Sequence, residues 1–356
     1  FKLSEDKIFT KYPTGVAVLQ SPFFFVAHFY SKLTNNKADG FGVPYHKAID
    51  ISAIFYLLLG LFFLFKFLKN YFTEKVVLFS VFILLFGTNL YYYATAESGL
   101  SHVYSFFLIS TFLYYYKKFI AIKSVKLLLL LAILLGFVFI VRQINIFLIL
   151  PMLFLDYDGI KPFINRFNFD WKAYLLGIVT FLLVVSPQFL YYFYLSNNLA
   201  YYSYGDEAFI YKYTPKILKV LFAFENGWIT NNPLHLITLS GIAYMLLLRL
   251  KNAIPIALLF IVITLTYASW WSTQLGCGLG HRGYVEFYPL FIIPIAYVVQ
   301  YLLNGNYDWK KYLILMFILI CIVVNIKLIY TFDGCWFGKS AWDYVEFSKL
   351  LFSPTK

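Results

Sequence analysis

Arginine is rare in this chain, and the positions of two of its four arginines make them candidates for chemistry. Lysine and arginine crowd the turns on one side of a ladder of apolar segments, whereas Arg142 and Arg282 fall on the other side. The sequence uses lysine wherever charge alone suffices, so arginine here indicates planar, bidentate recognition of a phosphate or a carboxylate. The alternative for Arg142 is a structural ion pair with an acid, namely Glu97, Asp50 or Glu286.

Arg282 lies in the segment WWSTQLGCGLGHRGYVEFYP, just before an apolar run begins. The glycines of this segment permit close approach of the backbone to a ligand, and together with His281 and Arg282 they would form a phosphate cradle. Any tight outer loop also uses glycine, so the glycine cluster by itself is weak evidence. The arginine on the side with few basic residues favours the functional interpretation.

Glu97 and His102 stand five residues apart in the short turn YYYATAESGLSH between two apolar runs. A carboxylate beside a histidine can orient a hydroxyl, accept a proton or bind a divalent metal. The alternative is an exposed turn acid and a histidine at the end of a helix. We favour the functional interpretation because a turn of so few residues must place Glu97 close to the ends of the helices. The sequence does not decide whether a metal is needed.

The elements that must position these residues are membrane helices. With 61% hydrophobic and 13% charged residues and a mean hydropathy of +0.73, the chain has more apolar surface than a soluble fold of this size buries. The continuous apolar runs lack the alternation of barrel strands. We therefore predict an all-α polytopic transmembrane bundle of about ten spanning or half-spanning helices, since a crossing takes about 20 residues. The runs cover residues 49 to 65, 76 to 93, 103 to 116, 127 to 141, 144 to 155, 173 to 195, 233 to 248, 253 to 271, 285 to 303 and 312 to 330.

The formal net charge of +12 is explained by topology better than by nucleic acid. The basic residues sit in short turns, and no soluble segment interleaves them with stacking aromatics, so we predict no nucleic-acid partner. By the positive-inside rule these turns face the cytoplasm. They carry Lys66, Lys69 and Lys75; Lys117, Lys118, Lys123 and Lys126; Lys161, Arg166 and Lys172; Arg249 and Lys251; and Lys310 and Lys311.

This topology depends on reading residues 127 to 155 as two short helices joined at Arg142 and Gln143. A single span there would put the later basic turns outside and destroy a consistent asymmetry. The outer side then carries the loop 196 to 232, where Thr214 and Pro215 predict the start of an interfacial helix. Pro22 predicts a pair of short juxtamembrane helices over residues 14 to 30 in place of a clean span.

The cysteines and the start of the chain give three further expectations. Cys321 lies in an apolar run and is expected to act as a small hydrophobe, whereas Cys277 and Cys335 share the outer side and would pair only in an oxidising compartment. The chain opens at Phe1 in polar sequence typical of the end of a loop. We therefore expect residues 1–356 to form a single transmembrane domain that lacks its first span and part of its first outer loop.

Several of these patches, in their order, resemble the GT-C superfamily of membrane glycosyltransferases. The resemblance is strongest to the bacterial group like dolichyl-phosphate-mannose-protein mannosyltransferases and aminoarabinose transferases, and it spans nearly the whole chain. The segments that carry it are KYPTGVAVLQSPFF at 11 to 24, YATAESGLSHVYSFF at 93 to 107, VRQINIFLILP at 141 to 151, YSYGDEAFIYKYTPKILKVLFAFENGWITNNPL at 202 to 234 and GLGHRGYVEFYPL at 278 to 290.

The resemblance implies an inverting transfer of a sugar from a polyprenyl-phosphate donor to a lipid-linked glycan, a cell-surface glycan or a protein. The reaction would take place on the extracytoplasmic face of a bacterial inner membrane, among membrane lipids. Glu97 and His102 are the implied catalytic residues. The implied contacts to donor phosphate and substrate are Arg142, Arg282, His281, Lys11, Tyr12 and Glu225, and the loop around Glu225 and Trp228 would help to close the cavity.

The chain departs from the family pattern where the principal catalytic aspartate is expected, after a first span. Glu5 and Asp6 are poor substitutes because they come immediately before the KYPTG patch. Glu97 would then be a second acid, and the chain by itself would be inactive. The alternative function is a lipid-linked glycan flippase or another transporter. The nearly uncharged spans and the absence of an obvious repeat favour the transferase.

Overall fold

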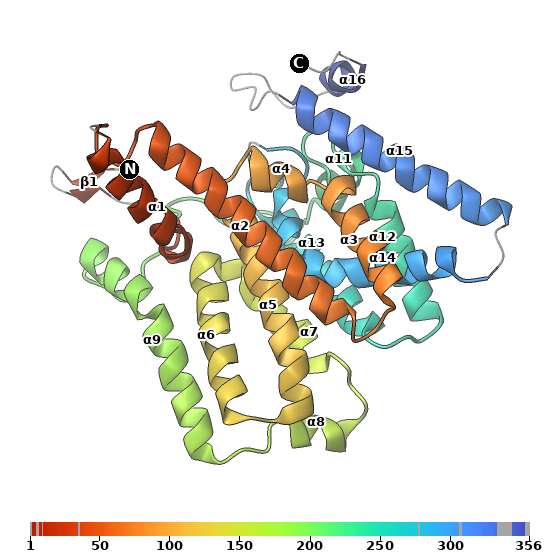
Figure 1. Ribbon diagram of the computed structural model, residues 1–356, viewed down its shortest axis with the longest axis horizontal. Helices are drawn as coiled ribbons and strands as arrows, with labels where there is room; N and C mark the ends of the chain where they lie inside the picture. Colours follow the sequence, from red (N-terminus) through yellow and green to blue (C-terminus); the bar gives the residue numbers. More distant parts are fainter. Residues whose placement is uncertain are drawn as a thin grey trace. The chain divides into compact units, whose positions relative to one another are not determined.

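The computed structural model describes residues 2–4, 7–8, 10–34, 36–276, 278–305, 308–332 and 344–352. The chain divides into two compact units. Unit 1 comprises Phe1–Leu64, Ser98–Met152 and Tyr157–Glu207, and unit 2 comprises Phe65–Glu97, Leu153–Asp156 and Ala208–Lys356. Figure 1 labels the elements.

The predicted helical architecture is confirmed, because each of the ten apolar runs is helical. The helices that match these runs are α2 (Val43–Leu68), α3 (Glu74–Gly87) followed by α4 (Leu90–Thr95), α5 (Ser101–Ile122), α6 (Val125–Val141), η1 (Gln143–Leu148) followed by α7 (Ile149–Phe154), α9 (Trp171–Ser196), α12 (His235–Leu247), α13 (Ala253–Ser269), η2 (Arg282–Phe287) followed by α14 (Tyr288–Leu303), and α15 (Trp309–Thr331). The remaining elements are β1 (Lys2–Ser4), β2 (Lys7–Ile8), α1 (Gly15–Leu33), α8 (Ile160–Arg166), α10 (Ile217–Phe222), α11 (Trp228–Asn231) and α16 (Tyr344–Phe352).

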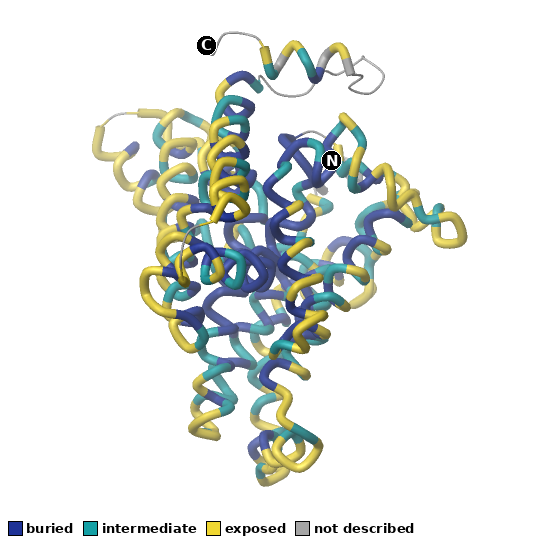
Figure 2. Tube along the Cα trace, turned by 90° about the vertical axis from the view of Figure 1, so that its right-hand side faces the viewer, coloured by how far each residue is buried: buried dark blue, intermediate teal, exposed yellow. Residues whose placement is uncertain are grey.

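Apolar residues line the outside of several of these helices, as expected of a protein surrounded by lipid. On α9, Leu182 and Leu183 are 50% and 68% exposed. Figure 2 shows exposed residues along whole helices as well as at turns. Within the described residues, four helical segments are long and apolar enough to cross a membrane: Val43–Leu68, Trp171–Ser196, Arg282–Leu303 and Trp309–Thr331. The protein is a polytopic helical membrane protein.

Unit 1 is organised around α6, which packs against α5 on one side and α9 on the other (Figure 1). Two glycines explain how closely its helices approach. A Cβ on Gly136 of α6 would lie 2.7 Å from the Val184 side chain of α9. A Cβ on Gly60 of α2 would lie 2.8 Å from the Phe106 ring of α5. Small residues allow such contacts between membrane helices, where packing takes the place of the hydrophobic effect.

Unit 2 is built on α14, which is buried along most of its length and packs on α12 and α3. A Cβ on Gly241 of α12 would lie 2.6 Å from the carbonyl oxygen of Pro294 in α14, so this contact also requires glycine. Helix α15 joins the bundle through Asn325, whose amide donates to the carbonyls of Phe86 and Thr88, both at 2.8 Å. It therefore satisfies acceptors at the end of α3 that have no helical donor.

One buried aspartate ties together the basic turns of unit 2. The Tyr71 hydroxyl, in the turn between α2 and α3, donates to Asp156 Oδ2 at 2.8 Å. Asn252, in the turn before α13, donates to Asp156 Oδ1 at 3.2 Å and accepts from the Asp156 backbone at 2.7 Å. Burial and the charge of Asp156 raise the pKa of Tyr71. The phenol therefore stays protonated and keeps this end of the unit fixed.

The structure corrects the prediction for residues 14 to 30. They form one continuous helix, α1, with Pro22 inside it, in place of two short helices. Proline removes the donor that would bond to the Val18 carbonyl, but the Ser21 hydroxyl donates to that carbonyl at 2.8 Å. The side chain therefore replaces the missing backbone bond, and the helix continues.

The loop 196 to 232 contains the predicted helix, α10, but it begins at Ile217, so Pro215 does not take the first helical position. Its position in the membrane interface stays a prediction. The ladder of β1 and β2 is a small strand feature that the sequence did not predict. Cys321 is 2% exposed within α15, as expected of a small hydrophobe. Cys277 and Cys335 lie outside the described residues, as do Glu5 and Asp6.

Candidate functional site

Arg142 occupies the predicted break between two helices. It ends α6 and precedes η1 with extended backbone angles, φ −161° and ψ 119°. The buried Asn145 holds this break, because its amide donates to Ser105 Oγ of α5 at 2.9 Å and to the Val138 carbonyl at 3.2 Å. The backbone at Arg142 is therefore fixed to α5 and α6 by an amide that is fully buried.

The guanidinium of Arg142 meets His102, the second residue of α5. Arg142 Nη1 lies 3.1 Å from His102 Nδ1, and the imidazole is 3% exposed. Arginine only donates hydrogen bonds, so Nδ1 must accept and the histidine proton must sit on Nε2. A neutral imidazole orients the guanidinium without neutralising its charge. The structure thus brings together two residues that the sequence selected separately.

The segment that carries Lys11 and Tyr12 is anchored to α9. The Thr14 backbone donates to Gln188 Oε1 at 2.7 Å, and the Thr10 backbone donates to the Tyr191 hydroxyl at 2.8 Å. Directly after it comes Gly15, the first residue of α1. A Cβ there would lie 2.6 Å from the backbone of Ile140 and of Val141. Glycine thus lets the segment pack on the last turn of α6, immediately before Arg142.

Glu207 and Tyr204 complete this group of charges. Lys11 Nζ donates to Glu207 Oε1 at 2.6 Å and lies 5.5 Å from the centre of the Tyr204 ring. Burial opposes the charged form of Lys11, but the hydrogen bond and charge of Glu207 prevail and raise its pKa. Burial raises the pKa of Tyr204, against the opposing effect of Arg142. We call Lys11, His102, Arg142, Tyr204 and Glu207 the cation cluster.

The cation cluster and the basic turns lie at opposite ends of the helices of unit 1. His102 is at the start of α5, whereas Phe119, near its end, stacks on Phe169 with ring centres 5.6 Å apart. Phe169 lies between Arg166 and Lys172, and Lys123 ends α5. The charge asymmetry inferred along the sequence is therefore a separation in space within this unit.

Unit 2 holds the other predicted residues, among them Glu97. The Tyr92 hydroxyl donates to Glu97 Oε1 at 3.3 Å. The charges of Glu97 and Arg282 act on Tyr92 in opposite senses. The charge of Arg282 also acts on the buried Tyr93. Glu97 and Arg282 therefore influence the same pair of tyrosines on α4.

The glycine loop before η2 uses its freedom to pack against protein side chains. A Cβ on Gly278 would lie 2.3 Å from the Tyr93 hydroxyl, and one on Gly280 would lie 2.7 Å from Asn232 Nδ2. Both glycines have positive φ, which also disfavours other residues. His281 has no exposed surface, and its Nε2 lies 3.0 Å from the Thr273 carbonyl, to which it donates. Arg282 in this loop is therefore only half-buried, whereas His281 is fully buried in the core.

Glu225 and Trp228 have different surroundings although they are close in sequence. Glu225 is half-buried and accepts from Gln274 Nε2 at 2.8 Å, which ties its loop to the glycine loop. Trp228 is 1% exposed and is stacked between His235 and Tyr284, with ring centres 4.0 and 4.5 Å away. Trp228 is a core residue of unit 2, so of these two only Glu225 retains exposed surface.

Three residues of unit 1 that the sequence reading did not select turn out to matter for the cation cluster. Glu207 and Tyr204 belong to the YSYGDEAF stretch, where two adjacent acids in a chain with 17 acids in total were an available signal. Gln188, 2% exposed in α9, holds Thr14. Its position in an apolar span was the only sign of a role. Long-range partners of this kind are not visible in a sequence without its fold.

The fold and these clusters define a class: a polytopic helical membrane protein with polar, arginine-bearing groups at helix ends. Residues 40–191 match the model of the family described as dolichyl-phosphate-mannose-protein mannosyltransferase. The match confirms the resemblance to the GT-C superfamily of membrane glycosyltransferases. The matching segment contains His102 and Arg142.

Comparison with solved structures and curated proteins adds two findings. The chain is similar to the crystal structure of ArnT from Cupriavidus metallidurans bound to undecaprenyl phosphate, with a TM-score of 0.49 and 16% sequence identity. The similarity covers 90% of this chain and 54% of that chain, so the present chain spans about half the length of that protein. No curated protein matches the chain.

Proposed function

We propose that this chain is part of a GT-C type glycosyltransferase that takes a sugar from a polyprenyl-phosphate donor. The observation that carries the proposal is the contact of Arg142 with His102, inside the segment that matches the mannosyltransferase family. Two residues chosen from their types and positions meet in one cluster at the end of the bundle that lies away from the basic turns. An anionic lipid headgroup at the membrane surface is the ligand that such a cluster suits.

The charges of the cation cluster fit a phosphodiester. Lys11 and Arg142 supply positive charge and hydrogen-bond donors for phosphate oxygens; Lys11 also pairs with Glu207, and Arg142 also donates to His102. A sugar phosphodiester carries one negative charge. When the sugar leaves, the remaining phosphate monoester carries up to two, so Arg142 would interact more strongly with the product-like state. Interactions that strengthen as charge develops accelerate a reaction.

The reaction follows from this placement. The acceptor hydroxyl oxygen attacks the anomeric carbon from the side opposite the phosphate, and the bond between that carbon and the phosphate oxygen breaks. The electron pair stays on the phosphate, which Arg142 and Lys11 hold. The acceptor proton passes to a carboxylate base. Glu97, which accepts from Tyr92, is the sequence candidate for a second acid.

The proposal also includes the class of acceptor and the side of the membrane on which the reaction takes place. The acceptor is a lipid-linked or cell-surface glycan, or a protein, on the extracytoplasmic face of a bacterial inner membrane. Two features support this location, namely the basic turns, which by the positive-inside rule face the cytoplasm, and the position of the cation cluster at the other end of unit 1.

The test is a product assay with the full-length protein, a labelled polyprenyl-phosphate sugar and cell-envelope extract. Arg142→Lys keeps the charge but loses the planar pair of donors, and Arg142→Ala loses both. We expect Arg142→Ala to lower turnover roughly 100-fold to 1,000-fold, as for a lost oxyanion donor, with Arg142→Lys between it and wild type.

Arg249→Lys, at an exposed arginine of a basic turn, is the matched control and should leave turnover unchanged. Normal transfer by Arg142→Ala, or lipid translocation without transfer by the wild type, would contradict the proposal.

A further inference from the structure

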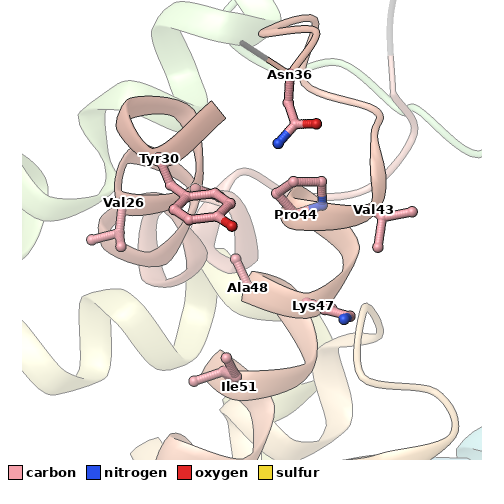
Figure 3. Close-up of a pocket in the computed structure, with 9 residues that line it drawn as sticks. Val26, Tyr30, Asn36, Val43, Pro44, Lys47, Ala48 and Ile51 are labelled. Carbon is pink, nitrogen blue, oxygen red and sulfur yellow. The ribbon is translucent and has the colours of Figure 1, made fainter. Parts of the chain in front are cut away.

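A groove of about 490 Å³ lies in unit 1 between α1 and the start of α2, away from the cation cluster. Its walls are mainly aliphatic, with Val26 on α1 facing Ala48 and Ile51 on α2 (Figure 3). Its volume falls within the range of roughly 300–1,000 Å³ that is usual for small-molecule sites. An aliphatic groove on a membrane protein is suited to a hydrocarbon chain.

Three polar groups gather at the rim of this groove. Tyr30, Asn36 and Lys47 all line it, and the Asn36 amide is directed toward the space between Tyr30 and Pro44 (Figure 3). All three can donate hydrogen bonds, and Lys47 adds a positive charge. None of the residues that line the groove is acidic. The two nearest acids along the chain bond elsewhere, Asp39 to the Phe41 backbone and Asp50 to Ser98. The rim therefore favours an anion.

The groove lies at the level where lipid headgroups meet the hydrocarbon. The first turns of α2 lie beside the turn that precedes α5, because Asp50 accepts from Ser98 in that turn. An acidic residue on a membrane helix belongs near the polar boundary, so this end of α2 lies at the membrane surface. That turn is at the cation-cluster end of α5. A chain in the groove thus has its head among the polar rim groups and its tail toward the membrane.

The length of α1 separates this groove from the cation cluster. Lys11 and Thr14 precede Gly15, the first residue of α1, whereas Tyr30 is fifteen residues further along the helix. At about 1.5 Å per residue the two places are roughly 22 Å apart along the helix axis. A phosphate held by Lys47 is therefore not the phosphate held by Arg142.

We propose that the groove between α1 and α2 binds one anionic phospholipid of the bilayer, with an acyl chain along Val26, Ala48 and Ile51 and its phosphate on Lys47, Tyr30 and Asn36. The lipid fills the space between α1 and α2. It thereby stabilises the position of α1. This helix begins at Gly15, the last residue of the KYPTG segment, which packs on α6.

Native mass spectrometry of the full-length protein tests this with phosphatidylglycerol and phosphatidylcholine of identical acyl chains. We expect the wild type to retain the anionic lipid preferentially. Lys47→Gln should weaken its retention roughly fivefold, since a lysine near an anionic headgroup has about that effect, and Lys47→Arg should restore it. Ala48→Phe fills the groove and should exclude both lipids. Lys75→Gln, an equal charge change in the exposed first turn of α3, should match the wild type.

Three outcomes would overturn the proposal. The first is equal retention of the two phospholipids by the wild type. The second is retention of the anionic lipid at the wild-type level by both single variants, Lys47→Gln and Ala48→Phe. The third is loss of the phospholipid in Arg142→Ala or its displacement by polyprenyl phosphate, either of which would place it in the donor site. Arg142→Ala also separates this proposal from the proposed function, because it should lower transfer roughly 100-fold to 1,000-fold while phospholipid binding persists.

Discussion

At the scale of single residues, the contact between Arg142 and His102 determines what the cation cluster can bind. A neutral imidazole that accepts from a guanidinium fixes its direction and adds no negative charge of its own. His102 is 3% exposed, so the imidazole has little freedom to turn away. The histidine therefore acts as a positioning residue for the arginine, and the sequence prediction that it would accept a proton stays a prediction.

The pH dependence of donor binding tests Lys11. Its pKa is raised in the folded protein, so the ammonium persists until the pH passes above the ordinary lysine value, and its contribution is lost only beyond that point. A phosphodiester does not titrate in this range. We expect the dissociation constant of the donor, measured by fluorescence titration, to stay constant between about pH 7 and pH 9.5. A loss of affinity centred below pH 9 that disappears in Lys11→Arg would show that this lysine is uncharged near neutrality.

Arg282 is the second arginine predicted to act, and its charge reaches Tyr92 and Tyr93 of unit 2. We predict that Arg282→Ala abolishes transfer by the full-length protein while membrane insertion stays intact. Loss of a charge that stabilises a developing anion gives a decrease of roughly 100-fold or more. The measurement is turnover of labelled donor, with carbonate extraction of membranes to check insertion. Turnover equal to wild type would remove Arg282 from the reaction.

At the scale of elements, a close approach of two helices places Lys11 beside the end of α6. Gly15 packs directly on the backbone of Ile140 and Val141, and Gln188 of α9 holds the preceding threonine. The YPTG part of the sequence thus has a structural explanation. Its glycine permits the contact with α6, and its threonine donates to Gln188 of α9. No part of that explanation requires a ligand.

Gly15→Ala tests this packing. The added Cβ would meet backbone atoms at 2.6 Å, and backbone cannot give way as a side chain can. We expect a loss of about 1–3 kcal/mol in the free energy of unfolding, as for overpacked sites, together with weaker donor binding. Gly177→Ala is the matched control, because its Cβ would have only ordinary contacts with Leu128 at 3.9 Å. It should be neutral or slightly stabilising through its helix propensity. Equal stability of both variants in thermal unfolding would refute the packing argument.

At the scale of the whole molecule, the orientation in the membrane decides whether the cation cluster can meet an extracytoplasmic acceptor. Gln143 and Lys123 are both exposed and lie at the two ends of α6. In a variant with all three cysteines replaced, Gln143→Cys should react with a membrane-impermeant thiol reagent in intact cells. Lys123→Cys should react only after permeabilisation, because the positive-inside rule places its turn in the cytoplasm. Reaction of both positions from one side would contradict the topology.

The fold was predictable to the extent that it depends on local composition. All ten apolar runs became helices, and the break at Arg142 came from balancing the basic turns on one side. The predictions that failed concern where helices begin and whether they break. Ser21 supplies the bond that Pro22 removes, so α1 continues where a break was expected, and the start of α10 shifted to Ile217.

The sequence by itself determined the class of this protein, its helical segments and the side of the ladder on which its rare arginines lie. Hydropathy determines which segments insert into the bilayer, and charge asymmetry determines their orientation. Both depend on each segment and its flanking turns almost independently of the rest of the chain. Only the tertiary structure decided the partners: His102 for Arg142, Glu207 for Lys11, and the core for His281 and Trp228. Such pairings join residues far apart in the chain, and they depend on helix contacts that a linear pattern does not encode.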